Sequence, residues 1–138
     1  MPRFVDTNVL LYALSDDPGE KAKRDAALSL LRAPDLALST QVLAEFHVQA
    51  TRPSRPHPVA HADAVAFAET LLVFTIQPVT TDVVRAAFAI QSRFDLSFWD
   101  AQIVAAARTA GCRELLTEDL NTGQDYDGVI AVDPFAVR

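Results

Sequence analysis

Cysteine, lysine and long apolar runs are scarce in this chain, and each scarcity excludes a class of protein. A single cysteine, Cys112, excludes an internal disulfide and fits a reducing compartment, so we expect the protein in the cytoplasm. No apolar run approaches the ~18–20 residues that span a membrane. Residues 1–17 are not expected to form a signal peptide, because Asp6 and Asn8 interrupt their short apolar stretch.

Basic residues are few as well. The chain has 12 Lys and Arg against 18 Asp and Glu, which gives a net charge of −6. This balance does not by itself predict nucleic-acid binding, because phosphate contacts usually come from a basic surface. The 138 residues are 50% hydrophobic, which is enough to bury a core, and the length predicts one domain over residues 1–138.

Short apolar segments alternate with amphipathic or alanine-rich segments along the chain. This pattern predicts an α/β fold in which a parallel sheet is covered by helices on both faces. The helix at 80–94 is expected to be capped by Thr81 or Asp82, and Gly111 suits the position just beyond the end of the last helix. The predicted strands are residues 3–7, 36–40, 74–79, 114–119 and 128–135; the predicted helices are 8–14, 17–33, 41–52, 59–72, 80–94 and 96–110, and a stiff proline loop is expected at 53–58.

One carboxylate lies on a helix face that should be buried. In "LSFWDAQIVAAA", residues 96–107, Asp100 shares a helical face with Ile103, Val104 and Ala107. A buried carboxylate loses its hydration unless it is paired, protonated or bound to a metal. The position of Asp100 therefore needs an explanation.

Three more acids are placed where they can join Asp100. Asp6 and Asp119 each close a predicted strand, and Glu45 lies about a turn and a half into the helix after the second strand. The carboxyl ends of parallel strands form the ligand crevice of open α/β sheets. Carboxylates that converge there raise one another's pKa, which a hard divalent cation relieves. Mg²⁺ or Mn²⁺ at such a site supports phosphodiester chemistry.

Each of these acids also has a purely structural interpretation. Ser97 and Asp100 have the spacing of an S-x-x-D capping box. Asp6 in "DTN" suits a strand-to-helix cap, Glu45 an exposed helix position, and Glu118-Asp119 an ordinary turn. Only the joint placement of the four acids favours a site.

Four stretches resemble PIN domains of the VapC toxin type, over residues 4 to about 135: "FVDTNVLLYAL", "LAEFHV", "LSFWDAQIVAAARTAGC" and "LLTEDLNTGQDYDGVIAVDPF". The resemblance implies a three-layer α/β/α fold with a central parallel sheet. It also implies a Mg²⁺- or Mn²⁺-dependent endoribonuclease that hydrolyses RNA phosphodiester bonds. Members are generally the toxin of a prokaryotic toxin–antitoxin pair, so the implied partners are an RNA substrate, a cognate antitoxin and a second copy of the chain.

The resemblance assigns the acidic residues by motif. Asp6 and Asp100 correspond to direct metal ligands, Glu45 to a ligand acting through water or orienting the attacking water, and Asp119 completes the pocket. Asp95 is the reserve candidate beside Asp100. The polar residues that would orient these carboxylates are Thr7, Asn8 and Thr117.

The resemblance also raises the question of what binds RNA and antitoxin. A local basic patch of Arg52, Arg55, His57 and His61 around the proline loop is one hypothesis, and an ordinary polar loop is the other. Helices over 8–14 and 26–33 are either walls of an antitoxin groove or plain core.

Other acidic or metal-binding folds fit less well. A phosphatase of the haloacid dehalogenase type needs D-x-D, but Asn8 holds its second position, and a receiver domain needs a lysine near its last strand, whereas the only lysines are Lys21 and Lys23. A zinc site from His47, His57 and His61 is possible only in principle, since no cysteine is near. The serious non-enzyme alternative is a PIN-like module that binds RNA or protein without cutting.

Overall fold

The computed structural model describes residues 2–136, which form one six-stranded sheet of order β3-β2-β1-β4-β6-β5. All neighbouring strands run parallel except β5 and β6, which are antiparallel. The predicted α/β class with a central parallel sheet is confirmed, but the short strand β5 was not predicted. The strands are β1 (Arg3–Val5), β2 (Leu36–Ser39), β3 (Thr75–Gln77), β4 (Glu114–Leu116), β5 (Asp125–Tyr126) and β6 (Val129–Val132).

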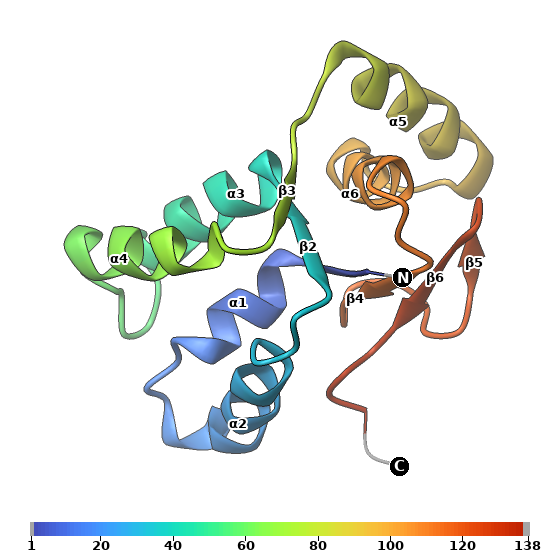
Figure 1. The fold of residues 1–138 in the computed structure, drawn as a ribbon. Coiled ribbons are helices and arrows are strands. Elements are labelled where there is room, and N and C mark those ends of the chain that lie inside the picture. The colour runs from blue at the N-terminus through green and yellow to red at the C-terminus, as the bar shows by residue number, and fades with distance from the viewer. Residues whose placement is uncertain (1, 137–138) are drawn as a thin grey trace.

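Helices cover both faces of the sheet. Helices α5 and α6 pack together on one face, and α1 and α2 lie on the other. Helix α3 packs against α1, and α4 packs against α3 (Figure 1). None of the described helices is long and apolar enough to span a bilayer. The helices are α1 (Thr7–Ala13), α2 (Lys21–Leu30), α3 (Thr40–Thr51), α4 (His61–Leu71), α5 (Thr81–Phe94) and α6 (Phe98–Thr109), with a 3₁₀ turn at Pro18–Glu20.

Capping groups explain where the helix boundaries differ from those predicted. The predicted helix 17–33 begins with the 3₁₀ turn, where the Asp17 carboxylate accepts a hydrogen bond from the Gly19 N–H at 2.9 Å. Helix α5 is capped by Thr80, whose hydroxyl accepts from the Val83 N–H, so the predicted cap at Thr81 or Asp82 was wrong. Gly111 has a φ of 80°, as expected for the residue after a helix end.

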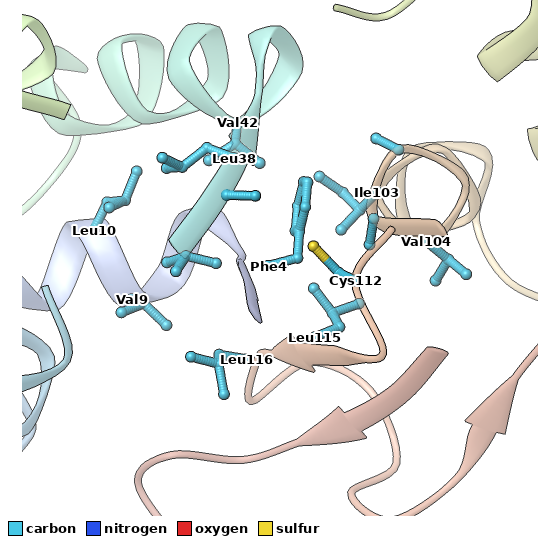
Figure 2. Close-up of a cluster of buried hydrophobic side chains, with 14 of the residues drawn as sticks. Phe4, Val9, Leu10, Leu38, Val42, Ile103, Val104, Cys112, Leu115 and Leu116 are labelled. Carbon is cyan, nitrogen blue, oxygen red and sulfur yellow. The ribbon is translucent and has the colours of Figure 1, made fainter. Parts of the chain in front are cut away.

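The core lies between the sheet and the helices on each side of it. Phe4 of β1 points toward Ile103 of α6, whereas Val9 and Leu10 of α1 lie on the other side (Figure 2). Every residue of α6 from Ala101 to Ala107 is buried. The alanines allow this helix to lie close to the sheet, which fixes its first turn relative to the strand ends.

Helices α1 and α2 pack against each other, and part of their apolar faces is core. Val9, Leu10 and Ala13 of α1 and Ala27 of α2 belong to the buried core. These residues are therefore core rather than the walls of an open groove.

A tight hairpin closes the far edge of the sheet. Strands β5 and β6 are joined by Asp127 and Gly128, with φ values of 59° and 97°. Asp127 also pairs with Arg93 of α5 and Arg108 of α6. The hairpin is thereby tied to the helix layer above it (Figure 1).

Candidate functional site

The four carboxylates singled out from the sequence line one cavity of about 210 Å³. Asp6 follows β1, Asp119 lies three residues after β4, Glu45 lies in α3, and Asp100 lies in the first turn of α6. Strands β2, β1 and β4 are adjacent in the sheet, so the segments that follow their carboxyl ends meet at one edge. The structure therefore brings all four together, as the strand-end argument predicts.

Asp6 is the most enclosed of the four. Its side chain is 6% exposed, and both oxygens accept hydrogen bonds. Oδ1 accepts from the Thr7 N–H at 2.7 Å, and Oδ2 accepts from the Thr117 hydroxyl at 2.8 Å. Burial raises the pKa of Asp6 to about 6, against the lowering effect of these two bonds, and the nearby Asp119 and Asp100 charges add to the rise.

Thr117 connects Asp6 to Asp119. Its hydroxyl donates to Asp6, so its oxygen can only accept from its other two partners. Those partners are the Asp119 N–H at 3.0 Å and the Asn8 side-chain amide at 3.2 Å. The same amide donates to the Asp119 carboxylate at 3.0 Å. The orientations of Asp6, Asp119 and Asn8 are therefore set by one hydroxyl group.

Glu45 is held at both carboxylate oxygens. The Thr7 hydroxyl donates to Oε2 at 3.1 Å, and the Gln41 amide donates to Oε1 at 3.0 Å. The Gln41 amide also donates to the backbone carbonyl of Trp99, at 3.2 Å. One side chain on α3 thus fixes Glu45 and the first turn of α6, where Asp100 lies.

Asp100 takes part in the start of α6 through its backbone, while its side chain lies at the acidic cavity. The hydroxyl of Ser97, the N-cap residue, accepts from the Asp100 N–H at 3.2 Å, so the helix start is capped. The Asp100 side chain also lines the acidic cavity. Burial raises the pKa of Asp100, and the charges of Asp119 and Glu45 add to the rise.

Glu118 is adjacent to Asp119 but belongs to a different cluster. Its carboxylate accepts from Lys23 Nζ at 2.9 Å and from the Tyr12 hydroxyl. Lys23 lies over the rings of Tyr12 and Phe135, with its Nζ 4.7 and 5.8 Å from their centroids. This neutralised cluster keeps Glu118 out of the acidic cavity and leaves Asp119 as the acid that lines it.

The donor set of the cavity fits a hard cation. Its lining contains four carboxylates and no lysine, arginine or histidine, so no side-chain cation offsets their charge. Oδ1 of Asn8 is buried and has no hydrogen-bond partner among the described residues. Within residues 2–136, no three His, Cys, Asp or Glu side chains lie so that they could hold a metal ion without moving. An oxygen-only set of this kind matches Mg²⁺ or Mn²⁺, which keep several water ligands.

The other candidate residues lie elsewhere. Asp95 is exposed, ends α5 with a φ of 55°, and does not line the cavity. His47 and His61 hydrogen-bond to each other at 2.8 Å, but His57 lies near Asp16, at 3.7 Å. The three histidines therefore do not form a zinc site.

The residues of the hypothetical basic patch lie at different cavities. Arg55 and His57 line a cavity that also contains Asp16, Asp17 and Glu20, so acids face these cations. Arg52 is exposed and lines a different cavity together with Glu45 and Gln49. Only Arg52 of that group is next to the acidic site.

Several residues of the site were missed from the sequence. Leu11, Gln49 and Trp99 also line the acidic cavity, and Gln41 orients Glu45. Gln41 precedes Glu45 by four residues, which is the helical spacing of facing side chains and the one signal that was available. Nothing in the sequence indicates that Gln41 also reaches Trp99.

The comparisons with known proteins agree on one family. The PIN domain family model matches residues 3–124. The structure is similar to that of VapC20 from Mycobacterium tuberculosis, described as a toxin that cleaves the sarcin–ricin loop, with 27% identity and a TM-score of 0.66 over 84% of this chain and 90% of that one. No protein of curated function matches the chain.

Two structures with lower sequence identity share the fold. A toxin–antitoxin complex from Klebsiella pneumoniae matches with 22% identity and a TM-score of 0.71, over 98% of this chain and 99% of that one. FitAcB from Neisseria gonorrhoeae matches with 18% identity and a TM-score of 0.68, over 97% of this chain and 99% of that one. These likenesses extend over nearly the whole chain and concern the fold.

Proposed function

Because the chain belongs to the PIN domain family, we propose that it is a Mg²⁺- or Mn²⁺-dependent endoribonuclease and the toxin of a toxin–antitoxin pair. The observation that carries this proposal is the cavity lined by Asp6, Glu45, Asp100 and Asp119. These acids come from four segments separated by up to 113 positions in the sequence, and they converge where no side-chain cation is present.

The proposed roles follow from how each carboxylate is held. Asp6 and Asp100 would hold the cation, since burial makes an ionised carboxylate without a cation unfavourable at both positions. Glu45, fixed at both oxygens, would hold the attacking water in line with the phosphodiester. Asp119 would complete the charge of the pocket, oriented by Asn8 and Thr117.

A bound Mg²⁺ or Mn²⁺ would lower the pKa of a water molecule and offset negative charge on the phosphate. The contribution of the chain is to keep the carboxylates separate and correctly oriented before substrate arrives. Thr7, Asn8 and Thr117 supply that order, because each donates a hydrogen bond to one of the four acids. Asp100 then faces inward because its partner is a cation.

Asp100→Asn tests this function most directly. The substitution removes the charge while retaining the Ser97 cap, which uses the Asp100 backbone N–H. With a mixed pool of end-labelled RNA and Mn²⁺, we expect the intact protein to cut and the variant to lose most of its activity. Titration of Mn²⁺ by electron paramagnetic resonance is expected to show weaker metal binding, and the melting temperature of the metal-free variant should not fall, because burial raises the pKa of Asp100.

Asp95→Asn is the matched control. Asp95 lies five positions away, is exposed and does not line the cavity, so removing its charge should leave cleavage and Mn²⁺ binding intact. If Asp100→Asn cuts normally but melts earlier, Asp100 acts only as a helix-start residue and the proposal fails. If the intact protein binds RNA but never cuts it, the chain is the non-catalytic module.

The partner of such a toxin is a small antitoxin protein. The likeness to toxin–antitoxin structures supports this partner. Co-expression with the product of a small neighbouring open reading frame should yield a complex that no longer cuts RNA. A homodimer remains a prediction, which light scattering of the purified protein checks, and the cytoplasm remains the expected compartment.

A further inference from the structure

A second cavity, of about 430 Å³, adjoins the acidic one. Glu45 and Trp99 line both, so the two cavities share a wall. The second cavity contains none of the other three acids. Its remaining walls are apolar at Ala44 and Val79 and polar at Thr40 and at two buried glutamines, Gln41 and Gln102.

Hydrogen bonds connect the polar residues that line this cavity. The Gln102 amide donates to the Gln41 carbonyl at 2.8 Å, and the Gln41 amide donates to Glu45 and to the Trp99 carbonyl. The ring of Trp99 meets Phe98 edge-on, with centroids 5.2 Å apart. Trp99 is the one tryptophan of the chain, and its side chain is 60% exposed. The Trp99 backbone is thus anchored, and its indole contacts Phe98 but remains largely uncovered.

Few positive charges are available to bind RNA phosphates near these cavities. Among the residues that line these two cavities and the one beside Glu45 and Gln49, Arg52 is the single lysine or arginine. The net charge of −6 opposes the usual binding through phosphates. Single-stranded nucleic acid has a second source of affinity, the stacking of unpaired bases on aromatic side chains.

We propose that this second cavity, which Trp99 and Gln102 line, takes an unstacked base of single-stranded RNA. The base would pack on the indole of Trp99, and the neighbouring phosphate would lie at the acidic cavity. The inference depends on the two cavities adjoining each other: Glu45 and Trp99 line both, and Trp99 immediately precedes Asp100. It deepens the proposed function and rests on it. Trp99 is then the residue that positions the strand for cutting.

The lone tryptophan makes the proposal directly measurable. RNA oligonucleotides of about 10 nucleotides, within the span of single-strand sites, are titrated into the protein with EDTA present, so that nothing is cut. We expect quenching of Trp99 fluorescence. Trp99→Ala should weaken binding roughly 5- to 150-fold, measured by anisotropy of labelled RNA, as expected for loss of one stacking partner. Trp99→Phe should retain most of the affinity.

Two controls separate stacking from damage to the fold. Val73→Ala removes part of another exposed apolar side chain that lines neither cavity, and it should bind as the intact protein does. In an oligonucleotide that the intact protein cuts with Mn²⁺, one base on either side of the cut is replaced by an abasic sugar. One replacement should weaken binding to the intact protein and cause no further loss in Trp99→Ala.

Three results would overturn the inference. Trp99→Ala binding RNA as tightly as the intact protein is the first. The second is an abasic effect that adds fully to that of Trp99→Ala. The third is a second copy on this surface, seen in sedimentation as a dimer that Trp99→Ala converts to a monomer. In each of these cases the intact protein can still cut RNA with Mn²⁺. If the proposed function is wrong, the intact protein does not cut RNA at all.

Discussion

Replacing Asp6 with asparagine should stabilise the metal-free protein at neutral pH. The folded protein holds the proton of Asp6 up to about pH 6, because burial raises this pKa from 3.8. An unfolded chain releases it near 3.8, so the free energy of unfolding falls as the pH rises between these two values. Since a tenfold change in proton affinity is worth about 1.4 kcal/mol, the ionised side chain costs the folded protein about 3 kcal/mol above pH 6.

Asparagine removes the charge but fits the site imperfectly. Asp6 accepts hydrogen bonds at both oxygens, from Thr7 and Thr117, and the amide group of asparagine can accept only one of them. The lost bond costs about 1 kcal/mol. Asp6→Asn should therefore raise the free energy of unfolding by about 2 kcal/mol at pH 7.5 with EDTA. Near pH 4, where Asp6 is already protonated in the folded protein, the two proteins should agree to within about 1 kcal/mol.

Urea unfolding of both proteins at the two pH values measures the effect. Excess Mn²⁺ should then stabilise the intact protein and not the variant, because a ligand that binds only the folded state stabilises it. Asp95→Asn controls for the loss of one negative charge outside the cavity. A variant that is destabilised equally at pH 7.5 and at pH 4 would refute the reasoning, since the burial of a charge would then not be what opposes folding here.

Three further predictions concern single side chains. Thr117→Val should raise the pKa of Asp6 still further, because it removes a hydrogen bond that stabilises the ionised form, and NMR titration of the carboxyl carbon would show it. Cys112 is buried and its pKa is raised to about 11, so Ellman's reagent at pH 8 should label the urea-unfolded chain and leave the native chain unlabelled. Asp127→Asn keeps a residue type that tolerates positive φ but removes the ion pairs with two arginines. Because these pairs are largely exposed, urea melts should show a free energy of unfolding lower by only about 0.5–1 kcal/mol.

The placement of the acids could be predicted because it follows from topology. Parallel strands end at a common edge, so residues that follow β1 and β4 must be neighbours wherever those strands are adjacent. Helix α6 ends just before β4 begins, and its first turn therefore lies toward the opposite, carboxyl edge. The predicted PIN family membership is confirmed by the family model. These conclusions need only the order of the elements.

Side-chain partners could not be predicted in the same way. Glu118 and Asp119 are adjacent acids, and the choice of which one lines the cavity depends on Lys23 and Tyr12, which lie far away in the sequence. Gln41 likewise finds Trp99 only through the packing of α3 beside α6. Contacts of this kind have no local signal.

The missed strand is a different case, because its signal was present. Asp127-Gly128 is a typical two-residue hairpin turn, and both residues have positive φ as such turns require. The prediction began a strand at Gly128 and so included the second residue of the turn in the strand. The two residues before the turn then form β5 against β6.

The span of the hydrogen bonds in the acidic cavity has a consequence for synthesis of the chain. Thr117 reaches Asp6, and Asn8 reaches Asp119, across 111 positions in each case. Asp6 is synthesised first and Asp119 more than a hundred positions later, so the N-terminal segment alone cannot hold the assembled cavity. Any chemistry that depends on this cavity would therefore begin only after Thr117 and Asp119 have been synthesised and have folded against the segment that follows β1.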